Sequence, residues 1–205
     1  MRPLTDPSFF DRDPATVAQE LLGTLLCRRG RDGLTVGRIV ETEAYLASGD
    51  SASHSWRGPG RKNASMFAEP GSAYVYTIHA RQCFNVVTEP EGIGSAVLIR
   101  ALEPVTGVAL MRRRRRTDNI RDLCRGPARL CEAFAVDRSL DGWNLLQGRR
   151  LWLALPSVET PVPGPDSEMC RSVRIGLSSN ADAPLRFFFT ANAFVSGPAK
   201  LNRGT

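Results

Sequence analysis

The chain has 205 residues, of which 42 % are hydrophobic and 23 % charged, the balance of a globular protein with one well-buried core. Its 27 Lys and Arg against 21 Asp and Glu give a net charge of +6, which permits a polyanionic partner without establishing one. No run approaches the roughly 18 apolar residues of a membrane-spanning helix, and the first residues, MRPLTDPSFF, lack the apolar core of a secretory signal. We therefore expect a cytoplasmic protein without a membrane partner.

The chain offers few residues of the kinds that bind metals. Its five cysteines are an odd number, widely spaced and without a CxxC pair, which is typical of reduced thiols rather than a disulfide framework. With His54 and His79 as the only histidines, a zinc site would have to be built mostly from carboxylates, which argues against zinc. We expect neither a metal nor another cofactor.

The first predicted element is a helix. Asp13 is a suitable N-cap, and Pro14 suits the first helical position. Apolar residues then follow at helical spacing, at Val17, Leu21 and Leu25. Gly30 and Gly33 mark a turn before the next element.

Residues 35–46, TVGRIVETEAYL, alternate in polarity and predict a β-strand. With a period of two, one face carries Ile39, Glu41, Glu43 and Tyr45. A strand carboxylate beside apolar and aromatic groups can act as a general base; the alternative is a pair of ion-paired surface glutamates. Residues i and i+2 point the same way, so these two cannot act as acid and base from opposite sides of a glycosidic bond.

A long polar loop and a predicted hairpin come next. Residues 47–65 show no periodicity, and compact domains seldom carry so long a loop without a function. The loop contains His54, Trp56, Arg57, Arg61 and Lys62. The runs 73–78 and 83–88 are rich in β-formers and close together, which predicts a hairpin with a basic, polar tip from His79 to Gln82.

Residues 96–102, AVLIRAL, predict an apolar strand interrupted by Arg100. A lone arginine in a buried strand must be paired or must face a cavity. Two interpretations are open: a structural salt bridge to Glu41, or an arginine that orients a carboxylate and its water. The tyrosines Tyr45, Tyr74 and Tyr76 are core residues or, beside His54, a sandwich for a flat ring.

The second half of the chain predicts two helices and three strands. Residues 105–111 are helical and run into Arg112–Arg116, which is either a solvated helix face or a source of phosphate affinity. A helix starts at Gly126-Pro127, strands are expected at 150–155, 171–177 and 185–190, and residues 156–167 form a Pro-rich loop. Residues 1–205 are therefore expected to form a single α+β domain. We expect a curved, mostly antiparallel sheet with flanking helices and a protruding β-hairpin.

Several ordered motifs together resemble the alkyladenine (3-methyladenine, N-methylpurine) DNA glycosylase family. They cover nearly the whole chain: IVETEAYL (39–46), ASHSWRG (52–58), MFAEPGSAYVYTI (66–78), CFNVV (83–87), SAVLIRALEP (95–104), LCRGPARLCEAFAV (123–136), RIGLS (174–178) and PLRFFFT (184–190). Several motifs in the same order are far more specific than any one of them.

The resemblance implies a monofunctional enzyme of base excision repair that needs no metal. Such an enzyme flips an alkylated purine, such as 3-methyladenine or 7-methylguanine, out of double-stranded DNA and hydrolyses its N-glycosidic bond. Carried over by position, Glu43 would be the general base that activates water. Arg100 and the backbone carbonyl of Ile175 would hold that water. The resemblance also implies a monomer, and it leaves hypoxanthine and ethenoadenine open as substrates.

The resemblance also assigns residues to the bound base and to the DNA. Tyr45, His54 and Tyr76 would stack on the flipped base, and Asn85 at the pocket floor would disfavour the 2-amino group of guanine. The family commonly places a tyrosine at the hairpin tip as a wedge in the duplex; here the position holds His79, with Arg81 as the alternative. The expected DNA contacts also include Met66, Arg57 and Lys62.

Two other classes of function remain open. One is a non-catalytic nucleic-acid-binding domain on the same scaffold, because the net charge and the arginines would serve it equally well. Glu43 together with Arg100 argues against it, since a pure binder needs no buried carboxylate facing a phosphate-rich ligand. The other is a hydrolase of free nucleosides, which would need neither the hairpin tip nor the basic loop.

Overall fold

The computed structural model describes residues 1–157 and 168–202, which form one α+β domain built on a curved antiparallel sheet. The strands are β1 (Arg2–Pro3), β2 (Leu25–Gly30), β3 (Gly33–Tyr45), β4 (Ala73–Ile78), β5 (Arg81–Thr88), β6 (Ser95–Thr106), β7 (Leu151–Leu155), β8 (Met169–Ser172) and β9 (Arg186–Phe189). The helices are α1 (Pro14–Glu20), α2 (Val108–Arg115) and α3 (Pro127–Phe134). Short 3-10 turns cover Pro7–Phe9, Ala64–Phe67, Ile120–Asp122, Arg138–Leu140, Leu145–Gln147 and Ala199–Leu201.

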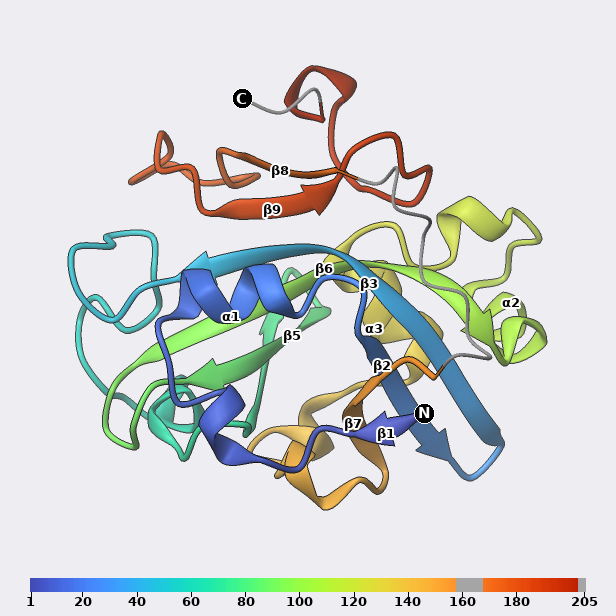
Figure 1. The fold of residues 1–205 in the computed structure, drawn as a ribbon, viewed down its shortest axis with the longest axis horizontal. Helices are drawn as coiled ribbons and strands as arrows, with labels where there is room; N and C mark the ends of the chain where they lie inside the picture. The colour runs from blue at the N-terminus through green and yellow to red at the C-terminus, as the bar shows by residue number, and fades with distance from the viewer. Residues whose placement is uncertain (158–167, 203–205) are drawn as a thin grey trace.

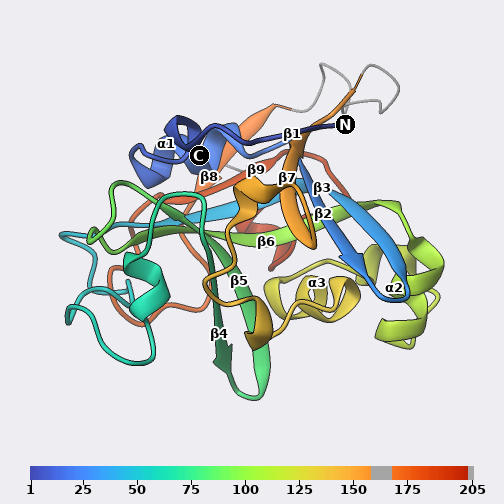
Figure 2. The same ribbon diagram turned by 90° about the horizontal axis from the view of Figure 1, so that it is seen from below.

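Strands β3 and β6 form the centre of the sheet, whose order is β1-β7-β2-β3-β6-β5-β4. Strand β9 pairs with the far end of β3, beyond β2, and with β8. Figure 1 shows β8 and β9 alongside β3, with α1 across the middle of the sheet. The β4–β5 hairpin projects from the sheet next to α3 (Figure 2). The expected α+β domain with a protruding hairpin is therefore confirmed.

The main hydrophobic core joins the sheet to its helices. Val17 of α1 and Phe134 of α3 belong to it together with Val75, Phe84 and Ile99 of the strands. The neighbouring positions along β4, β5 and β6 point the other way and line a cavity, because successive side chains of a strand alternate between its faces. The same strands therefore build both the core and the candidate site.

An irregularity between β3 and β6 decides where the buried glutamates point. Ile39 pairs with Leu102, Glu41 pairs with Ala101, and Thr42 pairs with Ile99, so each strand carries one extra residue, Val40 on β3 and Arg100 on β6. Such bulges turn the side chains beyond them. Ile39 consequently packs in the main core, whereas Glu41 contacts the backbone of Ser196 outside that core. The expectation that Ile39 and Glu41 share a face is wrong for this reason.

Several element boundaries differ from the sequence prediction. Helix α1 ends at Glu20, and Leu25 begins strand β2, because a turn intervenes in which the Thr24 N–H bonds to the Leu21 carbonyl. The spacing of Val17, Leu21 and Leu25 predicted one helix across both elements, because a short apolar run fits a helix and a buried strand equally well. Strands β1 and β2 were not predicted, and β8 ends at Ser172 instead of 177. The predicted loop at 156–167 lies outside the described residues except at its first two positions.

The hairpin tip is shorter than predicted. Ile78 pairs with Arg81 and Thr77 with Gln82, so only His79 and Ala80 form the turn. Both have positive φ, 47° and 58°, as a two-residue type I′ hairpin turn requires. Residues other than glycine pay roughly 1–2 kcal/mol for that conformation, so the tip holds His79 in a strained turn at the end of a rigid ladder.

None of the helices in the described part of the chain has the length and apolar character needed to cross a membrane.

Gly107, immediately before α2, provides a test of the packing at this end of β3. Its φ is +76°, and a Cβ there would lie 2.3 Å from the Leu34 carbonyl oxygen. Gly142 has nearly the same φ, +74°, with nothing within 4 Å of its Cβ position. We expect Gly142→Ala to cost roughly 1–2 kcal/mol of unfolding free energy and Gly107→Ala about 3 kcal/mol or more, because only the latter adds a backbone clash. Urea unfolding measures both, and equal losses would contradict the packing described here.

Candidate active site

A cavity of about 220 Å³ opens between β4, β5, β6, the loop after β3 and residues 175–177. Tyr45, His54, Tyr76, Asn85 and Arg100 line it. The structure therefore brings together side chains that lie far apart in the chain and that the sequence had singled out. Met66, expected at the DNA, is buried and also lines this cavity.

Glu43 lies immediately behind the cavity wall and is fully buried. Its Oε1 accepts a hydrogen bond of 2.8 Å from the backbone N–H of Ile175 and forms an ion pair of 3.2 Å with Arg100 Nη1. Its Oε2 accepts a hydrogen bond of 2.9 Å from the Tyr45 hydroxyl. All three partners line the cavity. Glu43 is thus a buried carboxylate held against a ligand-sized space.

Glu41 has a different environment, although it lies only two residues away. Its Oε1 accepts bonds from Arg100 Nε at 3.0 Å and Arg186 Nε at 2.7 Å, and its Oε2 accepts the Ser196 N–H at 2.7 Å. Burial opposes ionisation, but the two arginines hold the pKa of Glu41 below its usual value. The interpretation of Arg100 as a salt-bridge partner of Glu41 is confirmed, and the same guanidinium also reaches Glu43.

Uncharged aromatic rings line part of the cavity. His54 Nδ1 lies 2.7 Å from the Tyr74 hydroxyl, and the His54 ring meets Tyr76 edge to face with centroids 4.5 Å apart. Partial burial lowers the pKa of His54, so its ring is uncharged near neutral pH. Burial also raises the pKa of Tyr45 above its ordinary value, and its negative neighbour Glu43 adds to the effect. Asn85 Nδ2 donates to the Tyr74 carbonyl at 3.0 Å, which fixes the orientation of its amide.

A buried ion pair that sequence reasoning missed holds the two loops at the cavity together. Both side chains of the Asp50–Arg174 pair are fully buried, with N–O distances of 2.6 and 2.7 Å. Asp50 also accepts the Leu46 N–H, and Arg174 donates to the Ala44 carbonyl. The Arg174 guanidinium lies 4.6 Å from the centre of the Tyr45 ring. An aspartate in a polar loop gives no sign of burial, although Arg174 stands in the RIGLS motif.

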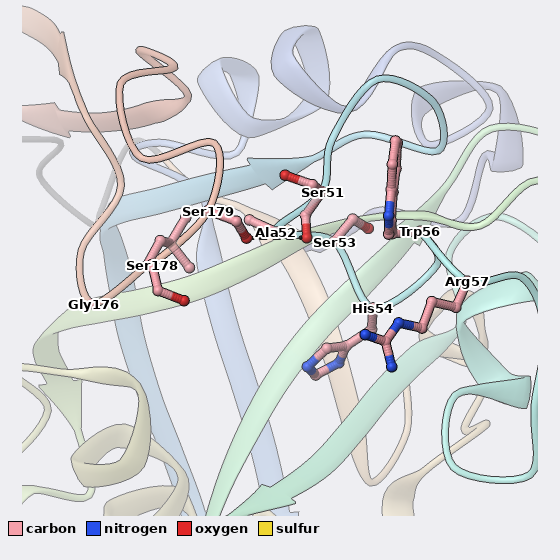
Figure 3. A pocket seen from close by; sticks show the side chains of 10 residues that line it. Ser51, Ala52, Ser53, His54, Trp56, Arg57, Gly176, Ser178 and Ser179 are labelled. Atoms are coloured by element: carbon pink, nitrogen blue, oxygen red, sulfur yellow. Dashed lines mark hydrogen bonds between the residues drawn. The ribbon is translucent and has the colours of Figure 1, made fainter.

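Two wider grooves adjoin the cavity, and His54 lines both of them. One, of about 540 Å³, is bordered by Ser51, Ser53, Ser178 and Ser179; Figure 3 shows the Arg57 side chain extending toward His54 while Trp56 points away. The other, of about 930 Å³, is bordered by the cationic side chains Arg57, Arg61, Lys62 and Arg138. The predicted DNA-contacting residues Arg57 and Lys62 thus lie at the mouth of the cavity.

The remaining cationic candidates separate into exposed and paired residues. His79 is exposed at the hairpin tip, whereas Arg81 forms an ion pair of 3.6 Å with Glu132 of α3. Within Arg112–Arg116, Arg114 pairs with Asp32 and Arg115 pairs with Glu132, and both side chains are largely covered. A uniformly solvated helix face is therefore the wrong description of this run.

The five cysteines are free thiols. Across residues 1–157 and 168–202, His, Cys, Asp and Glu form no group of three or more that could hold a metal ion.

The Asp50–Arg174 pair generates a prediction about stability and pH. Burial opposes the charge on Asp50, but hydrogen bonds from Arg174 and Asn180 hold its pKa below the usual carboxyl value. The stabilisation is therefore fully present above about pH 4, the unfolded-state pKa, and is lost as pH falls through the lower folded-state pKa. We expect Asp50→Asn to cost about 3 kcal/mol at neutral pH, with the difference from wild type shrinking below about pH 4.

Urea unfolding of both proteins across the acidic range measures this effect. The matched control is Asp32→Asn, because Asp32 is 40 % exposed in its pairs with Arg113 and Arg114 and an exposed pair contributes at most about 1 kcal/mol. A loss for Asp50→Asn no larger than the control's would contradict the role given to the buried pair.

Comparisons with known proteins place the chain in one family. The sequence model of the family described as methylpurine-DNA glycosylase (MPG) matches residues 8–193. A protein of Rhodopirellula baltica, provisionally named a 3-methyladenine DNA glycosylase, is 46 % identical over 200 residues, covering 95 % of this chain and 84 % of its own. Proteins of the same provisional name from Mesorhizobium japonicum and Methanoculleus marisnigri are 46 % and 44 % identical, covering 92 % of this chain and 88 % and 96 % of their own. The resemblance carried by the motifs is confirmed: the chain belongs to the methylpurine-DNA glycosylase family, whose members are DNA glycosylases that hydrolyse N-glycosyl bonds.

Proposed function

We propose that this protein removes alkylated purines, 3-methyladenine and 7-methylguanine among them, from double-stranded DNA. The damaged nucleotide flips into the 220 Å³ cavity, a water activated by Glu43 attacks its sugar carbon, and an abasic site remains. The observation that carries the proposal is Glu43 itself. A fully buried carboxylate, bonded only to groups that line the cavity, is costly to maintain unless its charge is used there.

The residues suit a cationic leaving group. Alkylation at N3 or N7 places a positive charge on the purine, so the base departs with little help from an acid, and a single general base suffices. The purine nitrogen takes the electron pair of the broken C–N bond, while the water oxygen bonds to the sugar carbon and gives its proton to Glu43. Arg100 and the Ile175 backbone keep the carboxylate in place. The Ile175 carbonyl is proposed to accept a hydrogen bond from the attacking water.

The cavity walls favour the same substrate. Stacked aromatic faces attract an electron-poor cationic ring more strongly than a neutral one. His54, uncharged near neutral pH because its pKa is lowered, would not repel the alkylated base. Tyr45 and Tyr76 complete the walls, and the fixed amide of Asn85 would discriminate against the 2-amino group of undamaged guanine.

The surroundings of the cavity suit duplex DNA. The cationic groove adjoins the cavity at His54 and supplies the phosphate contacts that give most of the sequence-independent affinity. The hairpin projects beyond the sheet (Figure 2), where His79 would fill the space left by the flipped nucleotide. Flipping costs a few kcal/mol and is cheapest at weakly paired lesions, which adds selectivity. The proposal includes base excision repair in the cytoplasm, by a monomer.

Glu43→Gln tests the chemical step. We expect single-turnover release of methylated purines from alkylated duplex DNA to fall by about 10²–10⁴-fold, because the amide cannot accept the proton. Binding of the lesion duplex should remain, since Glu43 lies behind the wall. Glu103→Gln is the matched control, because Glu103 also pairs with a buried arginine, Arg38, and is not among the residues that line the cavity. Equal release by Glu43→Gln and wild type would move the base elsewhere; DNA binding without release by the wild type would favour a non-catalytic domain.

His79→Ala tests the hairpin tip. We expect lesion-duplex affinity and excision to fall together by several-fold, because the imidazole that supports the flipped state is gone. Arg81→Ala is the comparison, and a smaller effect is expected because Arg81 is bound to Glu132 in the free protein. Gel-shift titrations with lesion and undamaged duplexes measure the affinity. Unchanged binding and excision in His79→Ala would remove His79 as the wedge, and a larger loss in Arg81→Ala would assign the role to Arg81.

A further inference from the structure

We propose that Glu41 and Arg186 are positioning residues for excision: they fix Arg100, and through Arg100 they fix the carboxylate of Glu43. The proposal rests on the proposed function, because it takes Glu43 as the base. The sequence alone offers Glu41 as a neighbour of Glu43 on one strand face and as a salt-bridge partner of Arg100, and it assigns no role to Arg186.

Four buried side chains alternate in charge from the C-terminal segment to the cavity. In order they are Arg186, Glu41, Arg100 and Glu43, and we call them the charge row. The three links measure 2.7 Å from Arg186 to Glu41, 3.0 Å from Glu41 to Arg100 and 3.2 Å from Arg100 to Glu43. The side chains of Arg186, Glu41 and Glu43 are 0 % exposed and that of Arg100 is 8 % exposed. The formal charges sum to zero, so each member depends on its neighbours for compensation.

Arg186 is the fixed end of the charge row. Besides Glu41, its N–H groups bond to the Ser172 hydroxyl, the Leu201 and Ser196 carbonyls and Asn202 Oδ1, so all five donors are used. The guanidinium also lies 4.4 Å from the centre of the Phe188 ring. A guanidinium held at five donors cannot shift, so it gives Glu41 a fixed position.

Glu41 in turn decides which atoms of Arg100 reach the cavity side. It takes Arg100 Nε and leaves Nη1 for Glu43, while Nη2 donates to the Ser196 hydroxyl at 3.4 Å. Without the Glu41 charge, Arg100 would be free to turn and bind Glu43 through two nitrogens, the stronger arrangement for this pair. Glu43 would then be held by the arginine at the expense of its contacts with Tyr45 and the Ile175 backbone. Because the nitrogens of Arg100 are shared between Glu41 and Glu43, the carboxylate of Glu43 keeps its orientation.

The neutral sum also has an electrostatic consequence that a purely structural role lacks. Removal of the Glu41 charge leaves one net positive charge behind the cavity, which favours the ionised form of the remaining carboxylate and moves the acid limb of the rate profile to lower pH. The other groups that face Glu43 are Arg100 on β6, the Tyr45 hydroxyl on β3, Tyr76 on β4 and Cys83 on β5. In the double variant Glu41→Gln/Arg186→Gln the formal charges of the charge row again sum to zero. The acid limb of the rate profile should therefore return toward its wild-type pH.

The experiment measures the single-turnover excision rate against pH and the affinity for a lesion duplex. The variants are Glu41→Gln, Glu41→Asp, Arg186→Gln, the double variant and the control Glu103→Gln. We expect Glu41→Gln to lose about tenfold to 10²-fold in rate, the scale of a small misplacement of a catalytic group, with affinity within about twofold and the acid limb at lower pH. Glu41→Asp keeps the charge but not the reach, so its rate should fall while its acid limb stays. The double variant should lose less than the product of the two single losses, because both substitutions act through one contact.

Thermal unfolding identifies any variant that fails to fold. If Glu41→Gln does not fold, Glu41→Asp decides, and a wild-type rate in that variant would overturn the proposal. A wild-type rate and pH profile in Glu41→Gln would also overturn it, as would a double variant whose losses simply multiply. These outcomes differ from a failure of the proposed function, which would show as excision by Glu43→Gln at the wild-type rate.

Discussion

The position of Arg100 between two buried carboxylates is the constraint on which the site depends. A buried arginine and a buried glutamate are each unfavourable alone, so the fold must keep them together. The extra residues on β3 and β6, Val40 and Arg100, turn Glu41 and Glu43 toward the same guanidinium. Strand β9 and the C-terminal segment then close over Glu41 through Arg186. Pairing of charge thus links the centre of the sheet to segments that lie far along the chain.

The lining of the cavity and the groove at its opening differ in electrostatic character. Inside, the aromatic rings are uncharged, and the one cationic side chain of the lining that the structure describes, Arg100, is paired with the buried carboxylates of Glu41 and Glu43. Outside, the groove beyond His54 is bordered by cations. This arrangement suits a cationic ring that enters from a polyanion: the backbone is attracted to the rim, and the ring meets faces that favour electron-poor aromatics. The same division would serve a neutral nucleoside poorly.

Rigid elements support the parts that would meet DNA. The tip of the hairpin is a two-residue turn with positive φ at His79 and Ala80, at the end of a regular antiparallel ladder. The loop after β3 has little regular structure, yet the buried Asp50–Arg174 pair ties it to the segment that carries Ile175. The buried Asp50–Arg174 pair therefore fixes the positions of these loops, and strand pairing fixes the position of the hairpin tip.

Sequence by itself determined the α+β class, strand β3, the hairpin and the choice of Glu43 and Arg100 as candidate site residues, because alternation, turn residues and ordered motifs are local signals. The tertiary structure decided the rest. Arg186 and Glu41 are 145 residues apart, and no local sequence pattern predicts such a pairing. The bulges likewise depend on how β3 and β6 pair. For this reason the prediction that Ile39 and Glu41 share a strand face is wrong. Burial and pairing of charges are properties of the assembled fold, which is why the supports of the site were visible only there.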